Sequence, residues 1–246
     1  MRMRRDRRGE PREKVPRVPL LLLPGLDGTS IFLEPLLAAL PDWIEPRVVT
    51  YPASDDGRYE PLLPLALDAV ADCSRFFVLG WSYGGPLALR VAAAAGDRVA
   101  GVILCATFVR APRPWLRPLR FAACAPIVGL LRALWRSRFL VIGWPSAAYR
   151  DAKRRALVAV GSRAMAGRVR ALLEEDSRER LRRLAMPVLC LQSARDVVVP
   201  PRNLAEIRAL RPEVAVATLA GGHLALFTDA GTASARIAEF ARRVPV

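Results

Sequence analysis

Histidine is nearly absent from this chain, and cysteine is sparse. One histidine occurs among the 246 residues, and the four cysteines form no C-x-x-C pair. A metal centre built from several histidines is therefore excluded, and the ligand spacing of a Cys/His zinc site is missing as well. Cys105 and Cys190 lie in apolar runs typical of strands, so we expect buried free thiols and a reducing compartment.

Long apolar runs and a cleavable leader are also lacking. No stretch of about 18 uninterrupted apolar residues occurs, so no membrane-spanning helix is predicted. Basic residues in 1–17 precede the run VPLLLL, but prolines bracket that run and no A-x-A cleavage pattern follows it. We interpret 1–17 as a disordered basic tail and expect a cytoplasmic protein.

Acidic residues are scarce beside the 38 Lys and Arg, and the net charge is +15. The excess is confined to 1–17 and to 108–185, where 18 basic residues face 5 acidic ones. No RNA-recognition or zinc-finger signature accompanies this charge, so we expect no nucleic-acid partner. Hydrophobic residues make up 52% of the chain, which excludes general disorder and provides a sizeable core.

Short apolar runs alternate with helical stretches over most of the chain. Six strands are expected, at 20–24, 46–51, 75–80, 99–105, 186–192 and 214–219. Helices are expected at 31–40, 61–73, 86–95, 201–210 and 232–243. This alternation requires right-handed crossovers and predicts an α/β fold, with a mostly parallel sheet of about six strands flanked by helices.

One segment, 108–185, interrupts the alternation. Three prolines open it, and helical stretches follow around 121–139 and 146–173. The chain is therefore expected to divide into a core, 18–107 and 186–246, and an inserted helical cap. The cap should lie at the carboxyl edge of the sheet, where open α/β sheets bind their ligands.

A G-x-S-x-G sequence, Gly80-Trp81-Ser82-Tyr83-Gly84, follows the buried run 76–79 and precedes a predicted helix. This context is that of a nucleophile elbow, a strained strand-to-helix turn that exposes a serine hydroxyl. The flanking glycines keep neighbouring side chains away from the hydroxyl. We therefore predict Ser82 as a nucleophile.

A serine nucleophile needs a base, and a base needs a carboxylate to orient it. His223, the only imidazole, follows two glycines and the last predicted strand. Asp196 directly follows the strand before it, which makes it the candidate acid. The rival carboxylate, Asp229, leads into the last helix, and we expect it to cap or solvate that helix. The chain order Ser82, Asp196, His223 is that of an α/β-hydrolase.

Backbone N–H groups should bind the oxyanion of the tetrahedral intermediate. Tyr83, directly after the nucleophile, is one predicted donor. Leu26, in the Gly-rich turn PGLDG after the first strand, is the other. The side chains of Leu26 and Trp81 are expected to line the substrate's acyl pocket.

Together these motifs resemble the α/β-hydrolase superfamily over residues 18–246. The resemblance is carried by LLLLPGLDG, FFVLGWSYGGPLAL, PVLCLQSARDVVVP and GGHLALF, and it implies the α/β-hydrolase fold. Ser82 separates the chain from the dehalogenase and epoxide-hydrolase branches, which need aspartate there. The GWSxGG motif and single cap also resemble the esterases that remove a methyl ester from pimeloyl-acyl carrier protein.

The expected activity is hydrolysis of a small-molecule carboxylic ester or thioester, with no cofactor and no metal. The same machinery serves acyltransferases, carrier-bound methyl ester esterases, lactonases, C–C bond hydrolases and cofactor-free haloperoxidases, which fold and triad do not separate. A non-catalytic relative that binds a small ligand is the alternative from another class. A binding module, however, has no need of all three triad residues.

The basic cap allows three interpretations: a solvated face, contact with an anionic membrane surface, or docking of an acidic acyl carrier protein. The carrier interpretation follows from the resemblance. The densest basic cluster is Arg150, Lys153, Arg154 and Arg155. Apolar cap residues are suited to an acyl tunnel and equally to plain packing; they include Trp115, Leu130, Leu131, Leu134 and Trp135.

Overall fold

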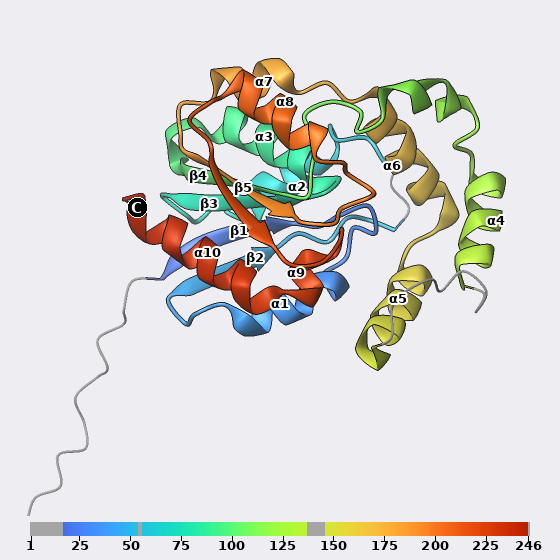
Figure 1. The fold of residues 1–246 in the computed structure, drawn as a ribbon, viewed down its shortest axis with the longest axis horizontal. Helices are drawn as coiled ribbons and strands as arrows, with labels where there is room; N and C mark the ends of the chain where they lie inside the picture. The colour runs from blue at the N-terminus through green and yellow to red at the C-terminus, as the bar shows by residue number, and fades with distance from the viewer. Residues whose placement is uncertain (1–16, 54–55, 137–145, 246) are drawn as a thin grey trace, which may run out of the picture.

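A parallel sheet of six strands forms the centre of the protein (Figure 1). The computed structural model describes residues 17–53, 56–136 and 146–245. The strand order is β2-β1-β3-β4-β5-β6, and every neighbouring pair is parallel. The strands are β1 (Val18–Leu23), β2 (Ile44–Val48), β3 (Phe76–Trp81), β4 (Val99–Cys105), β5 (Val188–Ser193) and β6 (Ala215–Leu219). The predicted fold class, an α/β-hydrolase sheet flanked by helices, is confirmed.

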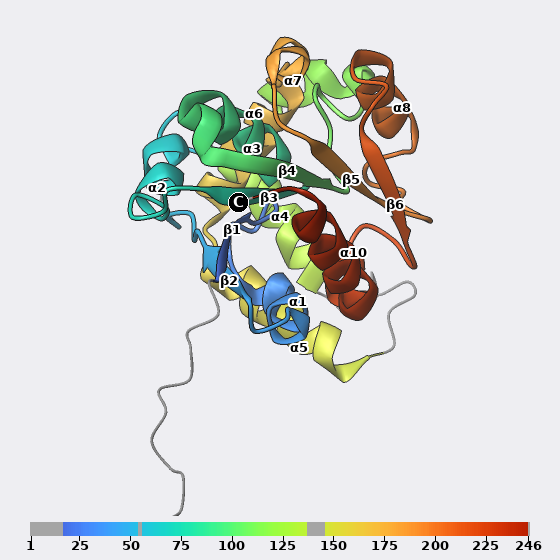
Figure 2. The ribbon, with the colours of Figure 1, turned by 90° about the vertical axis from the view of Figure 1, so that its left-hand side faces the viewer.

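Helices cover both faces of this sheet (Figure 2). One face carries α2 (Leu62–Asp68), α3 (Gly84–Ala95), α7 (Arg178–Arg183) and α8 (Arg202–Leu210). The other carries η1 (Ile31–Leu33), α1 (Glu34–Ala39), α9 (Ala225–Thr228) and α10 (Ala230–Arg243). Because strands β3 and β4 are buried along their whole length, they are apolar on both sides.

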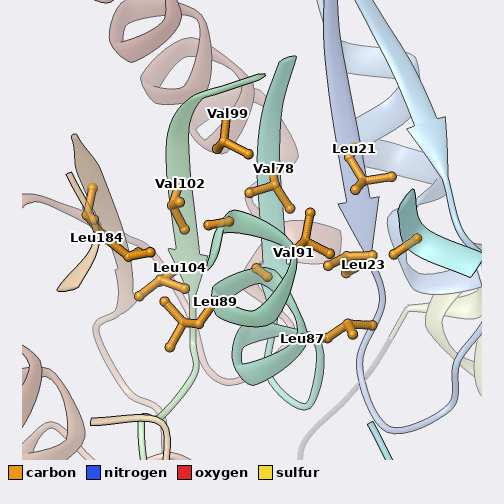
Figure 3. Close-up of a cluster of buried hydrophobic side chains, with 14 of the residues drawn as sticks. Leu21, Leu23, Val78, Leu87, Leu89, Val91, Val99, Val102, Leu104 and Leu184 are labelled. Carbon is orange, nitrogen blue, oxygen red and sulfur yellow. The ribbon is translucent and has the colours of Figure 1, made fainter. Parts of the chain in front are cut away.

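Strand periodicity separates the apolar core into two clusters. Leu21 and Leu23 of β1 face α3, whereas Leu20 and Leu22 face the opposite layer, since successive side chains point to opposite faces. Figure 3 shows the first cluster, where Val91 of α3 lies between β1 and β3. This packing fixes α3, and with it the turn that joins β3 to α3.

The segment between β4 and β5 is largely helical. It contains η3 (Pro114–Phe121), α4 (Ala125–Arg136), α5 (Ala147–Ala159), α6 (Ser162–Glu174) and α7. Helices α4, α5 and α6 lie together at one end of the sheet, while α7 packs against α3 and α8. Of the helices in the described ranges, none has the length and apolar composition needed to cross a bilayer.

The helical stretch expected at 146–173 is two helices. Val160 and Gly161 adopt extended conformations between α5 and α6. The break lets α5 pack against η1 on one side of the sheet, whereas α6 contributes Ala171 and Leu172 to the cluster on the other. Because the helical periodicity continues on both sides of the break, the sequence pattern did not indicate it.

Candidate active site

The turn after β3 holds Ser82 in a strained conformation. Its φ is +52°, a region that non-glycine residues seldom adopt, and its N–H donates to the Cys105 carbonyl at 2.9 Å. The flanking glycines permit the turn because a Cβ on Gly80 would lie 2.4 Å from the carbonyl oxygen of Gly84. A Cβ on Gly84 would lie 2.3 Å from the Leu23 carbonyl oxygen. Both glycines of the G-x-S-x-G motif are therefore required by backbone packing.

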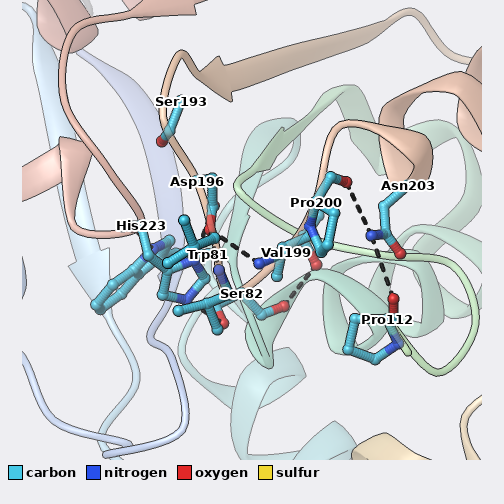
Figure 4. Close-up of polar contacts among 12 residues, drawn as sticks. Trp81, Ser82, Pro112, Ser193, Asp196, Val199, Pro200, Asn203 and His223 are labelled. Atoms are coloured by element: carbon cyan, nitrogen blue, oxygen red, sulfur yellow. Dashed lines mark hydrogen bonds and ion pairs between the residues drawn. The ribbon is translucent and has the colours of Figure 1, made fainter. Parts of the chain in front are cut away.

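A continuous hydrogen-bonded chain joins the serine, the histidine and the aspartate (Figure 4). His223 Nε2 lies 2.9 Å from Ser82 Oγ, and His223 Nδ1 lies 2.9 Å from Asp196 Oδ2. The other carboxylate oxygen, Oδ1, accepts the N–H groups of Val198 at 2.9 Å and Val199 at 2.8 Å. With its side chain fully buried, Asp196 is fixed in position and aimed at the imidazole.

The loops after β5 and β6 are tied to each other, which places the acid beside the base. The N–H of Arg195 donates to the Gly221 carbonyl at 2.9 Å. Asp229 Oδ2 accepts the N–H of Ala220 at 2.7 Å and makes no side-chain cap to α10. Asp229, expected to cap or solvate α10, is the N-cap residue of that helix, but its side chain makes no capping hydrogen bond and instead holds the start of the histidine loop.

Trp81, which precedes Ser82 in the elbow, contacts the loop that carries His223. The residue is 3% exposed, and its indole N–H donates to the His223 carbonyl at 3.2 Å. Its ring lies 3.2 Å from where a Cβ on Gly25 would stand and meets Phe32 edge-on. Its predicted part in lining an acyl pocket, like that of the partly buried Leu26, stays a prediction.

The two predicted oxyanion donors lie on neighbouring turns at the same edge of the sheet. Leu26 belongs to the turn 25–28, which a hydrogen bond of 3.0 Å closes between its first and last residues. Tyr83 immediately precedes α3, and its ring stacks on Tyr59 at a centroid distance of 4.5 Å. Its hydroxyl donates to the Gly57 carbonyl at 2.7 Å. Tyr83 is thereby anchored from both its backbone and its side chain.

Sequence reasoning missed two residues of this neighbourhood. Thr107 Oγ1 donates to the Ser82 carbonyl at 2.5 Å, and Gly85 leaves the room that Thr107 occupies. The guanidinium of Arg168, from α6, reaches the carbonyl of Leu26 at 3.1 Å. Thr107 follows β4, so its position at the carboxyl edge of the sheet could have indicated a place in the site. The sequence contains no comparable signal for Arg168.

In the basic cluster suggested for docking, one residue is buried and two form exposed ion pairs with neighbouring carboxylates. Lys153 is 7% exposed, and burial lowers the pKa of its ammonium group. Arg154 and Arg155 both pair with Asp151, at 2.7 and 3.1 Å, and Arg155 also binds Glu34. Among the apolar residues, Trp115, Leu130 and Leu131 are exposed, whereas the side chains of Leu134 and Trp135 lie outside those described.

None of the four cysteines, all of them among the described residues, contributes its side chain to the hydrogen-bonded chain of Ser82, His223 and Asp196. The Cys105 backbone carbonyl, however, accepts the Ser82 N–H. Burial raises the pKa of the Cys190 thiol to about 12 and that of the Cys105 thiol even further. Both therefore stay protonated, which is the unreactive form. Across the three described ranges, no group of three or more His, Cys, Asp or Glu side chains is placed to hold a metal ion.

Residues 20–238 match the model of the alpha/beta hydrolase family. The chain belongs to this family. A search of curated proteins by sequence gives no match.

Solved structures share the fold at low sequence identity. The enol-lactonase of Burkholderia xenovorans LB400 is 20% identical, with a TM-score of 0.73 over 96% of this chain and 94% of that one. A thermophilic esterase from Thermogutta terrifontis is 20% identical, with a TM-score of 0.74 over 93% and 91%. A bromoperoxidase from Bacillus anthracis is 16% identical, with a TM-score of 0.73 over 92% of both chains. This hydrolase thus shares one architecture with relatives of different activities.

Proposed function

We propose that the protein is a serine hydrolase that cleaves a carboxylic ester or thioester through an acyl-enzyme. Ser82 Oγ attacks the carbonyl carbon while His223 Nε2 takes its proton. The carbonyl oxygen becomes an oxyanion facing the N–H groups of Leu26 and Tyr83. His223 then returns the proton to the leaving alcohol or thiol as the bond to the acyl carbon breaks. Water, deprotonated by the same imidazole, then attacks the acyl carbon. The bond from that carbon to Ser82 Oγ breaks, His223 returns the proton to Oγ, and the carboxylic acid is released.

The observation that carries this proposal is the pair of 2.9 Å contacts on either side of the imidazole. A neutral imidazole with Nδ1–H donated to Asp196 presents a lone pair at Nε2, which is what a base needs toward Ser82. Asp196 in turn stabilises the imidazolium that forms after proton transfer. Since Oδ1 of Asp196 is occupied by two backbone N–H groups, Oδ2 alone is directed at the ring.

Structures with this fold include proteins named for ester chemistry and proteins named for other activities. Two of the structures with this fold are named an enol-lactonase and an esterase. The bromoperoxidase shows that the same fold carries a different activity, so the substrate has to be found by assay. Carrier-bound esters are a separate case: within the cluster suggested for carrier docking Lys153 is buried, whereas Arg150, Arg154 and Arg155 are exposed.

The direct test is a series of p-nitrophenyl esters of increasing acyl length, run beside acyl thioesters. We expect turnover of at least one series and its loss, by several orders of magnitude, in Ser82→Ala. Adding a primary alcohol as acceptor separates an acyltransferase, which forms a new ester, from a hydrolase. Undiminished turnover in Ser82→Ala contradicts the assignment, and ligand binding without turnover favours the non-catalytic alternative.

A further inference from the structure

Arg168 is a charged residue in the interior of the protein. It lies on α6, within the inserted segment, and is 0% exposed. Its guanidinium donates to three backbone carbonyls, those of Leu26 at 3.1 Å, Asp27 at 2.9 Å and Pro52 at 2.9 Å. Burying a guanidinium is unfavourable unless such acceptors satisfy it. An apolar residue would fill the same space without the cost of burying a charge. It could not donate hydrogen bonds, however, so we attribute the presence of an arginine here to the three carbonyls that it binds.

These contacts complete the anchoring of the Gly-rich turn after β1. The hydroxyl of Tyr51 donates to the Pro24 carbonyl at 3.1 Å, and its N–H donates to the Gly28 carbonyl at 2.9 Å. The Gly25 carbonyl accepts the N–H of Gly28, and Arg168 binds the two carbonyls between. Every carbonyl of the turn thus has a donor. Since the C=O and N–H of one peptide unit point in opposite directions, the bound Gly25 carbonyl orients the Leu26 N–H. The Gly28 N–H that binds it is oriented in turn by the Asp27 carbonyl, which Arg168 holds.

The second oxyanion donor is tied to the same point of α6. Tyr83 donates its hydroxyl to the Gly57 carbonyl, and Gly57 lies directly against α6. A Cβ on Gly57 would lie 2.0 Å from the backbone nitrogen of Arg168, and one on Gly167 would lie 1.9 Å from the Asp56 carbonyl oxygen. This is close backbone contact with no room for side chains. A shift of α6 would therefore move the support of both donors.

Helix α6 is itself fixed to the helix that follows the elbow. Glu175, at the end of α6, pairs with both terminal nitrogens of Arg90 on α3, each at 2.9 Å. Their side chains are 2% and 12% exposed, and Ser177 adds a further contact to Arg90. A bidentate, buried pair of this kind has one geometry. Helix α6 thus bridges α3 and the turn after β1.

We propose that Arg168 is a positioning residue for the oxyanion hole, so that α6 of the inserted segment belongs to the catalytic machinery. The inference rests on the proposed function. Oxyanion stabilisation depends on donors that already face the developing charge. Without Arg168, the Asp27 carbonyl loses its donor, so the Asp27–Gly28 peptide can rotate and its N–H no longer holds the Gly25 carbonyl. The Gly25–Leu26 peptide, which carries the Leu26 N–H, is then free to turn away from the oxyanion. Substrate binding in the ground state depends far less on that alignment.

The test compares Arg168→Met with Arg170→Met, using p-nitrophenyl acetate as substrate. Arg170 lies on the same helix but is exposed. The two variants therefore carry the same Arg-to-Met substitution, and only Arg168→Met removes contacts to the turn. We expect kcat to fall by about 10- to 100-fold in Arg168→Met, with KM changed by less than about threefold. Affinity for heptyl trifluoromethyl ketone, which forms a tetrahedral adduct with the serine, should weaken in the same proportion. Arg170→Met should match the wild type.

Two milder variants keep the test decisive should Arg168→Met fold poorly. Tyr51→Phe removes the donor to the Pro24 carbonyl, and Tyr83→Phe removes the donor to the Gly57 carbonyl, while both keep the aromatic ring. Each should lower kcat and ketone affinity together, by about 3- to 10-fold. Arg168→Lys keeps the charge with fewer donors, so its kcat should lie between those of Arg168→Met and the wild type.

The outcomes separate this inference from the proposed function. Loss of turnover in Ser82→Ala, together with wild-type kcat and ketone affinity in folded Arg168→Met and in both Phe variants, overturns the inference and leaves the function standing. A lowered melting temperature with unchanged kcat assigns Arg168 a purely structural role and also overturns it. Equal turnover in Ser82→Ala and wild type overturns the function, and the inference with it.

Discussion

Replacing Asp196 by asparagine should disable the histidine while leaving the fold in place. The outcome follows from the geometry of the carboxylate. Its Oδ1 accepts two backbone N–H groups, from Val198 and Val199, and only an oxygen can keep both bonds. The asparagine amide must therefore turn its NH₂ group toward His223 Nδ1. An NH₂ donor there demands an unprotonated Nδ1, so the ring proton moves to Nε2 and faces Ser82.

In that tautomer the imidazole cannot accept the serine proton. We expect kcat/KM to fall by about 10⁴-fold, the size associated with a triad histidine held in the wrong tautomer. The amide still bonds to the same partners, so the free energy of unfolding should change by only about 1–2 kcal/mol. The assay is hydrolysis of p-nitrophenyl butyrate, with urea unfolding of both proteins followed by circular dichroism.

Asp229→Asn is the matched control, because it makes the same substitution in the other carboxylate of the histidine region. Its amide oxygen can still accept the N–H of Ala220, so kcat/KM should stay within about threefold of wild type. The reverse pattern, with Asp229→Asn inactive and Asp196→Asn active, would refute the assignment of the acid.

Two further predictions follow from contacts beside the site. Thr107→Val removes the hydroxyl that holds the Ser82 carbonyl, so stability to urea should drop by about 1 kcal/mol and kcat by several-fold, whereas Thr107→Ser should keep most of kcat. Because the pKa of the Cys190 thiol is raised in the folded protein, this thiol ionises at lower pH in the unfolded chain, with a pKa of about 8.5. Its full contribution to the free energy of unfolding is therefore present below about pH 8.5 and is lost as the pH rises. Above that pH, this thiol should lower the free energy of unfolding by about 1.4 kcal/mol per pH unit. In urea titrations between pH 8 and 10.5, Cys190→Ala should reduce the slope by that amount, while the slope from Cys105 stays.

The fold could be predicted because its determinants are local. Continuous apolar runs such as 76–79 can be buried on both sides only in a covered parallel sheet, and helices of about ten residues between them imply parallel crossovers. The relative positions of Ser82, Asp196 and His223 followed from the same pattern, since each was placed just after a predicted strand. Parallel strands end at one edge, so residues far apart in sequence meet there.

What the sequence concealed depends on contacts between distant segments. Arg168 resembles the other arginines of the basic, Arg-rich segment between β4 and β5, and its burial under the turn at Leu26 joins segments about 140 residues apart. For Asp229 the span is shorter: its position before the last helix suggested a cap or a solvated residue, whereas its carboxylate binds the N–H of Ala220, nine residues earlier. Charge and periodicity describe a residue's neighbours along the chain. They therefore do not indicate which backbone groups Arg168 or Asp229 binds in the folded protein.

The central claim is that Ser82 is the nucleophile, and covalent labelling tests it most directly. A fluorophosphonate should add to the folded protein at one site, and peptide mass spectrometry should place the adduct on Ser82. The Asp196→Asn and His223→Ala variants should label far more slowly, since a serine without its base is a poor nucleophile. Failure of the wild type to label, or an adduct on another residue that persists in Ser82→Ala, would contradict the account.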